Sequence, residues 1–278
     1  MIWVDGRVVP DEALSLSIRD RAFEHGLGLF ETLRTWNGRA TLLSRHLARL
    51  ERSAKALGIP LDRKTLPDQN GVSELLAAEN RDLDMLLRIT TSGGGPSGSS
   101  PAIVWMRTAA LPPAVDRSGA VVGIAEYQVS WEDPLARHKT LNYWSRRIAA
   151  ERAYDEGADE ALIGSPDGRV WEGTRMNLFV VRGRSVTTAG LDAPIVPGIM
   201  RSIVLELADA AGLSIRETAP TLREIDQADE VFLTNAVRCI VPVGRAPGRV
   251  LNAPGPWTTL LRDRLADWIR EENEKPSV

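Results

Sequence analysis

One lysine in the middle of the chain stands out as a residue that could do chemistry. Lys139 is one of four lysines, with Lys55, Lys64 and Lys275, whereas arginine supplies the rest of the 34 basic residues. Among cationic side chains, only lysine loses its proton readily enough to attack a carbonyl carbon, because a guanidinium stays protonated. Lys139 is therefore a candidate nucleophile, and the ordinary alternative is a solvated lysine at a helix end.

Glu172 is a candidate partner for a cationic group. It follows Val170 and Trp171 at the end of an apolar strand, and a carboxylate beside a tryptophan needs a cation if it is buried. A protonated pyridine ring nitrogen would serve, and so would a neighbouring arginine. The residues alone leave both partners open.

Two features could bind a phosphate. Pro197-Gly198-Ile199-Met200 is typical of a helix start, where backbone N–H groups and the helix dipole favour an anion. Arg49 lies beside the apolar stripe of an earlier helix and could clamp the same phosphate with its forked guanidinium. Each feature also has an ordinary interpretation, since every helix has such a start and most helix arginines face water.

The composition is that of an ordinary globular chain. Its 278 residues suffice for two domains or one large one, and the net charge of −3 is spread over interspersed signs. That distribution is unlike a nucleic-acid-binding surface. The single cysteine, Cys239, leaves no disulfide framework, and no apolar run is long enough to span a membrane. We therefore expect a cytoplasmic protein with neither nucleic-acid nor membrane partners.

Several common catalytic signatures are missing from the sequence. It has no G-x-S-x-G, no H-E-x-x-H, no phosphate-binding P-loop and no paired C-x-x-C. The three histidines, at 25, 46 and 138, lack the spacing of metal ligands, so no metal site is expected. Gly26-Leu27-Gly28 is half of a dinucleotide fingerprint, but Glu31 occupies the third glycine's place and a strand is expected to follow.

Turn dipeptides divide the chain into hairpins with helices between them. Asp5-Gly6, Asn37-Gly38, Asp167-Gly168 and Arg182-Gly183 each separate two apolar segments. Asn-Gly and Asp-Gly supply the positive φ angles that tight hairpins need, so we expect much antiparallel sheet. Apolar periodicity predicts helices over 44–57, with Ser44 as N-cap, and over 72–80, 143–156, 198–211 and 257–272.

A pair of prolines, Pro112 and Pro113, lies between two expected strands over 102–106 and 120–125. Such a pair is typical of a linker between lobes. We therefore expect an α+β protein. Residues 1–111 would form a small α/β lobe, 112–119 the linker, and 120–278 a large lobe that carries Lys139.

These segments, in this order, resemble the class IV (fold-type IV) pyridoxal-phosphate enzymes. That family includes branched-chain aminotransferases, D-amino-acid aminotransferases, (R)-selective amine transaminases and aminodeoxychorismate lyase. The similar segments cover 20–32, 46–50, 138–143, 172–179, 197–201 and 232–243, so the resemblance spans nearly the whole chain. It implies a two-lobed fold with a pseudo-barrel as the larger lobe, the cofactor between the lobes, and a homodimer whose partner subunit helps to wall the site.

The resemblance also implies a role for each candidate residue. Lys139 would hold pyridoxal 5'-phosphate as an internal aldimine and then move the proton at the substrate α-carbon, while Glu172 would keep the pyridine nitrogen protonated. Tyr143 would hydrogen-bond the phenolic oxygen, although branched-chain enzymes have one more residue between lysine and tyrosine. The phosphate would be held by Arg49, Ile199, Met200, Asn235 and Ala236. The substrate would contact Phe30, Arg88, Ala236 and Val237.

The residues favour one reaction and keep a second open. Arg88 matches an arginine of branched-chain aminotransferases, and residues 92–100 lack the arginine and histidine of D-amino-acid aminotransferases. We therefore expect an aminotransferase that moves an amino group between an amino acid or amine and a 2-oxo acid.

The alternative is aminodeoxychorismate lyase, a carbon–oxygen lyase that forms 4-aminobenzoate and pyruvate. Segments 28–32, 198–201 and 232–236 are more similar to that enzyme, whereas Asn142-Tyr143 replaces its usual Asn-Arg. A non-catalytic protein of the same fold is a third hypothesis, against which the presence of Lys139, Glu172 and Arg49 together argues.

Overall fold

The computed structural model describes residues 1–81, 83–115 and 118–274, and they group into two compact units. The first unit comprises Met1–Pro112, His138–Asn142 and the chain from Ile269 on. The second comprises Pro113–Arg137 and Tyr143–Trp268. The lysine segment, which the sequence analysis assigned with the later lobe, thus groups with the first unit.

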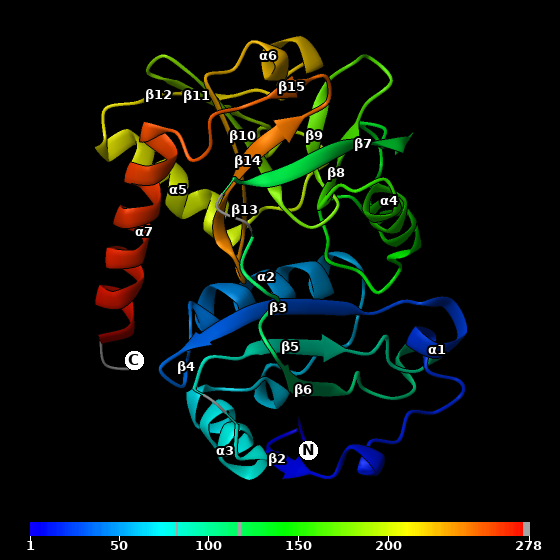
Figure 1. Cartoon of the computed structure of the whole chain (residues 1–278). Coiled ribbons are helices and arrows are strands. Elements are labelled where there is room, and N and C mark those ends of the chain that lie inside the picture. The colour runs from blue at the N-terminus through cyan, green and yellow to red at the C-terminus, as the bar shows by residue number, and fades with distance from the viewer. Residues whose placement is uncertain (82, 116–117, 275–278) are drawn as a thin grey trace. The chain divides into compact units, whose positions relative to one another are not determined.

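The first unit is built on an antiparallel sheet of six strands in the order β2-β1-β6-β5-β3-β4 (Figure 1). Its strands are β1 (Ile2–Val4), β2 (Arg7–Val9), β3 (Leu29–Trp36), β4 (Arg39–Ala40), β5 (Leu86–Thr91) and β6 (Val104–Ala109). Its helices are α1 (Arg21–His25), α2 (Leu43–Ala56) and α3 (Gln69–Glu79), with short 3-10 turns at Asp11–Ala13, Arg63–Thr65 and Pro96–Gly98. Helix α2 packs on β3, so side chains of this helix and of this strand can contact each other.

The second unit contains a sheet of nine strands, part of which closes on itself. Strand β9 pairs with both β8 and β10, so the path β10-β13-β14-β7-β8-β9 returns to its start and forms a closed barrel. The strands are β7 (Ala120–Gln128), β8 (Glu160–Gly164), β9 (Val170–Gly173), β10 (Asn177–Arg182), β11 (Ser185–Thr188), β12 (Ser214–Glu217), β13 (Glu230–Asn235), β14 (Cys239–Ala246) and β15 (Arg249–Val250). The helices are α4 (Trp144–Asp155), α5 (Ile199–Ala210), α6 (Leu222–Asp226) and α7 (Pro256–Glu274), of which the last continues into the first unit's range.

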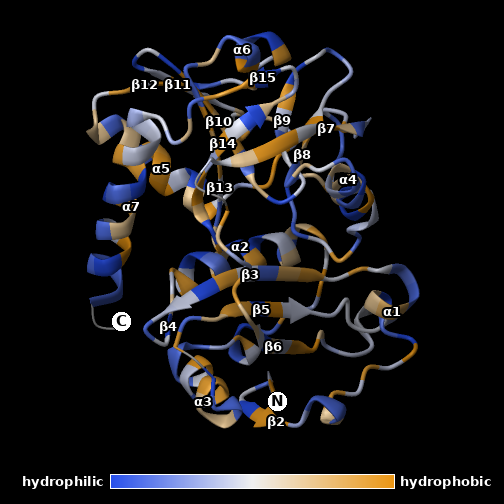
Figure 2. Ribbon diagram, viewed as in Figure 1, coloured by the Kyte–Doolittle hydropathy of each residue, from blue (hydrophilic) through white to orange (hydrophobic). Residues whose placement is uncertain are grey.

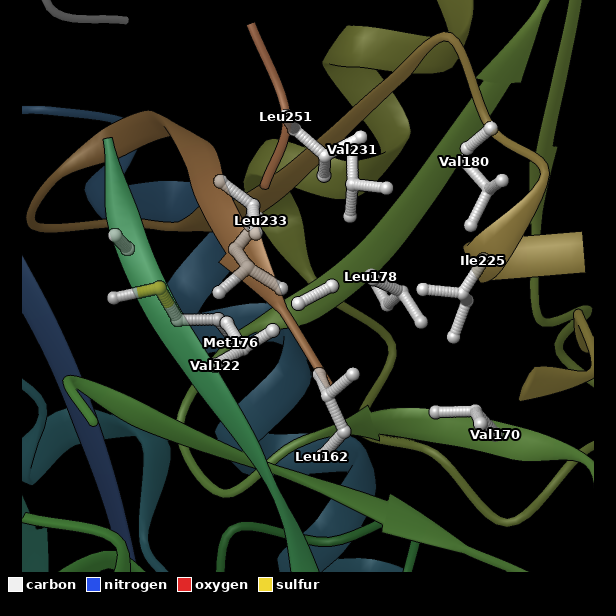
Figure 3. Close-up of a cluster of buried hydrophobic side chains, with 14 of the residues drawn as sticks. Val122, Leu162, Val170, Met176, Leu178, Val180, Ile225, Val231, Leu233 and Leu251 are labelled. Atoms are coloured by element: carbon white, nitrogen blue, oxygen red, sulfur yellow. The ribbon is translucent and has the colours of Figure 1, made fainter. Parts of the chain in front are cut away.

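Closure of the barrel creates a core that the sequence pattern alone does not show. Val122, Leu162, Leu178 and Leu233, from β7, β8, β10 and β13, are buried in one cluster (Figure 3). Figure 2 shows the same central strands coloured mainly as hydrophobic, whereas α4 carries many charged residues. Burial of such side chains stabilises a fold by about 1.5–3 kcal/mol each, so this cluster fixes the strand ends that carry the candidate residues.

All four predicted hairpin turns are confirmed. Each joins two paired strands, β1–β2, β3–β4, β8–β9 and β10–β11, and every turn glycine has a positive φ. The expectation of mainly antiparallel pairing holds for the first unit. In the second, β7 pairs in parallel with β8 and β14, and β11 with β12. Helices α4 and α5 form crossover connections there, and a crossover returns the chain in the same direction.

The predicted helices exist, but the N-cap assigned to Ser44 is wrong. Helix α2 begins at Leu43, and Leu42 stands at the N-cap in the left-handed conformation with φ of 57°. Only two residues separate β4 from the helix, so the chain reverses through Leu42 before Ser44 can cap it. In the described part of the chain, no helix is both long and apolar enough to cross a bilayer.

Candidate active site

Backbone pairing to the start of β3 fixes the position of Lys139. The N–H of Phe30 donates to the carbonyl of Lys139 at 2.9 Å, and the N–H of Leu141 donates to the carbonyl of Gly28 at 2.9 Å. A Cβ at Gly28 would lie 2.6 Å from Leu141 Cδ1 and 2.7 Å from the carbonyl oxygen of Thr91. Only glycine fits there, so the predicted signature of residues 20–32 includes the glycine that lets the lysine segment approach.

The aromatic ring of Phe30 lies next to two cationic side chains. Lys139 Nζ lies 4.3 Å from the ring centroid, and Arg88 Cζ lies 3.7 Å from it. Arg88 reaches the ring from β5, where its residue pairs with Thr32 of β3. The structure therefore brings together three of the predicted residues in one place: the candidate nucleophile and two candidate substrate contacts.

A buried ion cluster lies at the contact between β3 and α2. Glu31 is 1% exposed and accepts hydrogen bonds from Arg49 Nε at 2.8 Å and Arg49 Nη2 at 2.6 Å. Its Oε2 also lies 2.8 Å from His46 Nδ1. Burial alone would raise the pKa of Glu31, but Arg49 and His46 outweigh it and lower the pKa to about 2. Glu31 is therefore a permanent anion in the folded protein.

This cluster changes the predicted role of Arg49. The fork that was expected to clamp a phosphate is directed at Glu31, through Nε and Nη2 together. Phosphate binding by Arg49 stays a prediction, and a phosphate would have to share the guanidinium with Glu31. Burial also lowers the pKa of His46, against the pull of Glu31. The neutral imidazole then donates from Nδ1 to Glu31.

In the second unit, the end of β9 presents Glu172. Trp171 anchors this end, because its Nε1 donates to the carbonyl of Val129 at 2.9 Å inside the core. Glu172 is 3% exposed, and both oxygens accept hydrogen bonds. Arg146 Nη2 donates to Oε1 at 2.6 Å, Asn177 Nδ2 donates to Oε2 at 3.0 Å, and the Val196 N–H lies 3.2–3.3 Å from the two oxygens.

The arginine partner that the sequence left open is therefore Arg146, near the start of α4. Its Nη1 also donates to the carbonyls of Gly173 and Thr174 at 3.3 and 3.2 Å. The Tyr143 hydroxyl donates to the same Thr174 carbonyl at 2.8 Å. Burial raises the pKa of Tyr143 to about 12, so the phenol stays protonated near neutral pH. Tyr143 thus lies at the Glu172 end of the barrel.

The start of α5 offers backbone donors, as predicted. Gly198 is the N-cap without a side-chain hydrogen bond, and Ile199 and Met200 form the buried first turn. A Cβ at Gly198 would lie 1.9 Å from Asn177 Oδ1, so glycine is required for the approach of β10. Because Asn177 Nδ2 also binds the Val196 carbonyl at 3.0 Å, one side chain connects this helix start to Glu172.

The turn between β13 and β14 is closed by one of its predicted residues. Asn235 Oδ1 accepts from the N–H of Val237 at 3.0 Å and from that of Arg238 at 2.8 Å. Val237 was predicted to contact the substrate, and a contact through its N–H would compete with this turn. Strand β14 then begins at Cys239, where the backbone has a φ of 59°.

Each unit by itself suits a different part of pyridoxal 5'-phosphate. Glu172 offers a buried carboxylate to a ring N–H, and the uncapped first turn of α5 offers N–H groups to a phosphate. Lys139 offers an amine to an aldehyde. The residues that the sequence analysis missed are Arg146 and, as ion partners, Glu31 and His46. Only the i+3 spacing of Tyr143 and Arg146 on an expected helix could have pointed to the former.

Comparison with known proteins supplies the family. Residues 28–246 match the model of the family described as "Amino-transferase class IV". The chain belongs to that family. It is a pyridoxal-phosphate-dependent enzyme of the α+β, two-lobed fold type IV, and it moves an amino group between an amino compound and a 2-oxo acid. The family and cofactor predicted from the sequence are thus confirmed.

Curated relatives of this enzyme have several activities. A putative branched-chain-amino-acid aminotransferase of Methanocaldococcus jannaschii is 31% identical, over 96% of this chain and 95% of its own. A D-alanine aminotransferase of Bacillus licheniformis is 29% identical over 99% of both chains. An aminodeoxychorismate lyase of Vibrio harveyi is 31% identical, over 95% of this chain and 99% of its own.

Solved structures agree with the fold. A branched-chain aminotransferase of Thermoproteus uzoniensis with norvaline superposes with a TM-score of 0.89 at 26% identity, over 98% of this chain and 95% of that one. A second branched-chain amino acid aminotransferase, solved with pyridoxamine 5'-phosphate, gives a TM-score of 0.86 at 26% identity, with the same coverage of both chains.

Proposed function

We propose that this enzyme transaminates amino acids that carry a free carboxylate, with Lys139 as the catalytic residue. The strongest support is the arrangement around Phe30, where the Lys139 amine and the Arg88 guanidinium lie against one ring. A substrate whose amino group reacts near Lys139 has an anionic group within reach of Arg88. Charge-assisted hydrogen bonds to a carboxylate are about twice as strong as neutral ones, so Arg88 would favour amino acids over simple amines.

The other residues have roles that follow from their chemistry. The bound cofactor supplies an electron sink for the carbanion that deprotonation of the substrate creates. Lys139 holds the cofactor covalently and moves the proton at the substrate α-carbon. Glu172 accepts a hydrogen bond from the ring N–H, and Tyr143 orients the phenolic oxygen. The phosphate binds to the N–H groups of Ile199 and Met200, with support from Arg49 and the turn at Asn235 and Ala236.

The test is to add candidate amines one at a time to the yellow holoenzyme and to follow its visible absorption. L-leucine, L-glutamate, D-alanine, an (R)-arylamine and aminodeoxychorismate cover the relatives' activities. We expect an amino acid to bleach the band and a 2-oxo acid to restore it. If no amino acid bleaches the band, the proposed use of amino acids that carry a free carboxylate is wrong.

The role of Arg88 has its own test with a matched control. Arg88→Leu should raise KM for amino acids roughly tenfold to a hundredfold, the value of one charge-assisted hydrogen bond. It should leave an amine without a carboxylate unaffected. Arg34 stacks in the same way on Trp36, with its Cζ 3.7 Å from the ring centroid, near the opposite end of β3 from Phe30. Arg34→Leu should therefore not change KM, and equal effects of both variants would rule out substrate binding by Arg88.

The second candidate is the lyase reaction. It is favoured by the 31% identity to the Vibrio harveyi lyase and by the lyase-like segments 28–32, 198–201 and 232–236. The same absorption experiment separates the two. Consumption of aminodeoxychorismate alone, with pyruvate released and the band recovered without any 2-oxo acid, would establish the lyase.

We also infer that the enzyme is a homodimer located in the cytoplasm. Trp144 and Ile148 are 73% and 41% exposed and lie one turn apart on α4, and exposed apolar neighbours of this kind mark interfaces. Light scattering should give about twice the chain mass of 30.4 kDa. A monomer at micromolar concentration would contradict the dimer. The single cysteine fits a reducing compartment, and fractionation of the native host would test the location.

A further inference from the structure

Arg146 already neutralises the carboxylate that is proposed to bind the cofactor ring. Its Nη2 donates to Glu172 Oε1 at 2.6 Å, and only 16% of its side chain is exposed. Burial would lower the pKa of Arg146, but Glu172 and Tyr143 outweigh it and raise the pKa above its ordinary value. The guanidinium is thus a permanent buried cation beside Glu172.

Orientation of Glu172 does not depend on this cation alone. Asn177 Nδ2 binds Oε2 at 3.0 Å, and the Val196 N–H lies 3.2–3.3 Å from both oxygens. These two neutral donors come from β10 and from the entry to α5, both fixed by the barrel core. What Arg146 adds, and they cannot, is a positive charge.

A charge in this place has a definite consequence for a ring nitrogen that binds Glu172. A carboxylate that already forms an ion pair is a weaker acceptor, and a second cation near the first is repelled by it. The ring nitrogen would therefore hold its proton less firmly than beside an unpaired glutamate. Arg146 would act through Glu172 without touching substrate or cofactor.

We propose that Arg146 is a positioning residue whose charge limits the preference of Glu172 for a protonated cofactor ring. This inference rests on the proposed contact between Glu172 and the ring nitrogen. It predicts that two residues together control protonation of the ring nitrogen, namely Glu172 on β9 and Arg146 on α4.

A matched pair of variants separates the charge from the shape. Arg146→Lys and Arg146→Met both lose the fork and its bonds to the Gly173 and Thr174 carbonyls, but only the lysine keeps a cation. The probes are pyridoxal phosphate and its 1-deaza analogue, in which the ring nitrogen is replaced by C–H. Their affinities for the apoprotein are measured by quenching of tryptophan fluorescence, which needs no turnover.

The expected result is a change in the ratio of the two affinities. The preference for pyridoxal phosphate over the deaza analogue should be about tenfold larger in Arg146→Met than in Arg146→Lys, because one nearby charge is removed. The wild type should behave like the lysine variant. Equal ratios in the two variants would overturn the role of the charge and leave Arg146 as a structural ion-pair partner.

Loss of the cation could unfold the apoprotein, since it removes the guanidinium that forms an ion pair with the buried Glu172. In that case Arg146→Gln replaces Arg146→Met, and recovery of folded protein with each probe is measured. Pyridoxal phosphate should restore folding at about tenfold lower concentration than the deaza analogue, because its ring N–H supplies the missing positive charge. Equal recovery with both probes would contradict the proposal.

Glu172→Gln distinguishes this inference from the function on which it rests. In that background, the identity of residue 146 should no longer change the affinity ratio. If both the wild type and Glu172→Gln bind the two probes equally, Glu172 does not contact the ring nitrogen. The inference about Arg146 is then wrong as well. A different outcome is that the wild type prefers pyridoxal phosphate over the deaza analogue and that this preference is lost in Glu172→Gln. If the affinity ratios of Arg146→Lys and Arg146→Met are then equal, only the inference about Arg146 is wrong.

Discussion

The two units each bury a glutamate–arginine pair, and the two pairs differ in how the carboxylate is used. Glu31 receives two nitrogens of Arg49 and one of His46, all side chains of α2. Glu172 receives one nitrogen of Arg146, one of Asn177 and a backbone N–H, each from a different segment. The first pair forms a closed cluster between one strand and one helix. The second gathers several elements around a strand end.

The difference indicates what each pair is for. A forked, two-bond contact satisfies both partners and holds β3 against α2, which is a structural task. The contacts of the second carboxylate come from three separate segments at a strand end, an arrangement that suits the contact with a ring N–H proposed above. Identical residue types thus hold a helix on a strand in one unit and, in the role proposed for Glu172, bind the cofactor in the other.

Glu31→Gln should show the largest effect on stability. It removes the carboxylate that forms a buried ion pair with Arg49, and breaking such a pair typically costs about 3–5 kcal/mol. Urea unfolding of the apoprotein should show this decrease in the free energy of unfolding. Glu51 of α2 is the control, because it forms an ion pair with Arg63 near the surface. Glu51→Gln should lower the free energy of unfolding by less than about 1 kcal/mol. Similar costs for both variants would show that the Glu31 cluster does not stabilise the fold.

Acid should weaken the first pair through Glu31 itself. Its pKa is about 2 in the folded protein against an ordinary 4.5, so its contribution is complete above pH 4.5 and is lost as the pH falls toward 2. Linkage puts this contribution on the order of 3 kcal/mol. His46 acts in the same direction, since its lowered pKa means that the unfolded imidazole takes up a proton first below pH 6.5. Unfolding free energies measured from pH 7 to 3 should fall more steeply in wild type than in Glu31→Gln, and parallel curves would contradict the assignment.

Glu172→Gln should reverse the pattern of Glu31→Gln, with a large effect on turnover and a smaller one on folding. A neutral amide is a poor partner for a protonated ring nitrogen, and we expect kcat to fall on the order of a hundredfold. Arg146 keeps its hydrogen bonds to the Gly173 and Thr174 carbonyls in this variant, which moderates the cost to folding. Glu151→Gln, on the surface of α4, should leave kcat unchanged. If turnover is unchanged in Glu172→Gln, the Glu172–Arg146 pair has only a structural role, like the Glu31–Arg49 pair.

Local patterns predicted most of the fold, because they depend on neighbouring residues. The turns at Asn37-Gly38 and Asp167-Gly168 need positive φ, and the sequence supplies the residues that adopt it. Closure of the barrel also needs pairings between strands far apart in the sequence, such as β7 with β14 and β10 with β13, and no local pattern contains that information.

The candidate site divides in the same way. Lys139 and Glu172 could be proposed from the sequence because a rare lysine, and a carboxylate at the end of an apolar strand, invite a chemical explanation. The partners of Glu31 and Glu172 were not found, since an arginine in a chain with so many arginines carries no signal by itself. The sequence suggested a phosphate or water as the partner of Arg49, whereas its fork contacts Glu31.

Identification of the lysine that carries the cofactor tests the central claim most directly. The holoenzyme is reduced with borohydride, digested, and its peptides are analysed by mass spectrometry. We predict a pyridoxyl group on Nζ of Lys139, with turnover absent in Lys139→Ala and retained in Lys55→Ala, a variant at an exposed position of α2. A pyridoxyl group on Lys55, Lys64 or Lys275, or normal turnover by Lys139→Ala, would contradict the account.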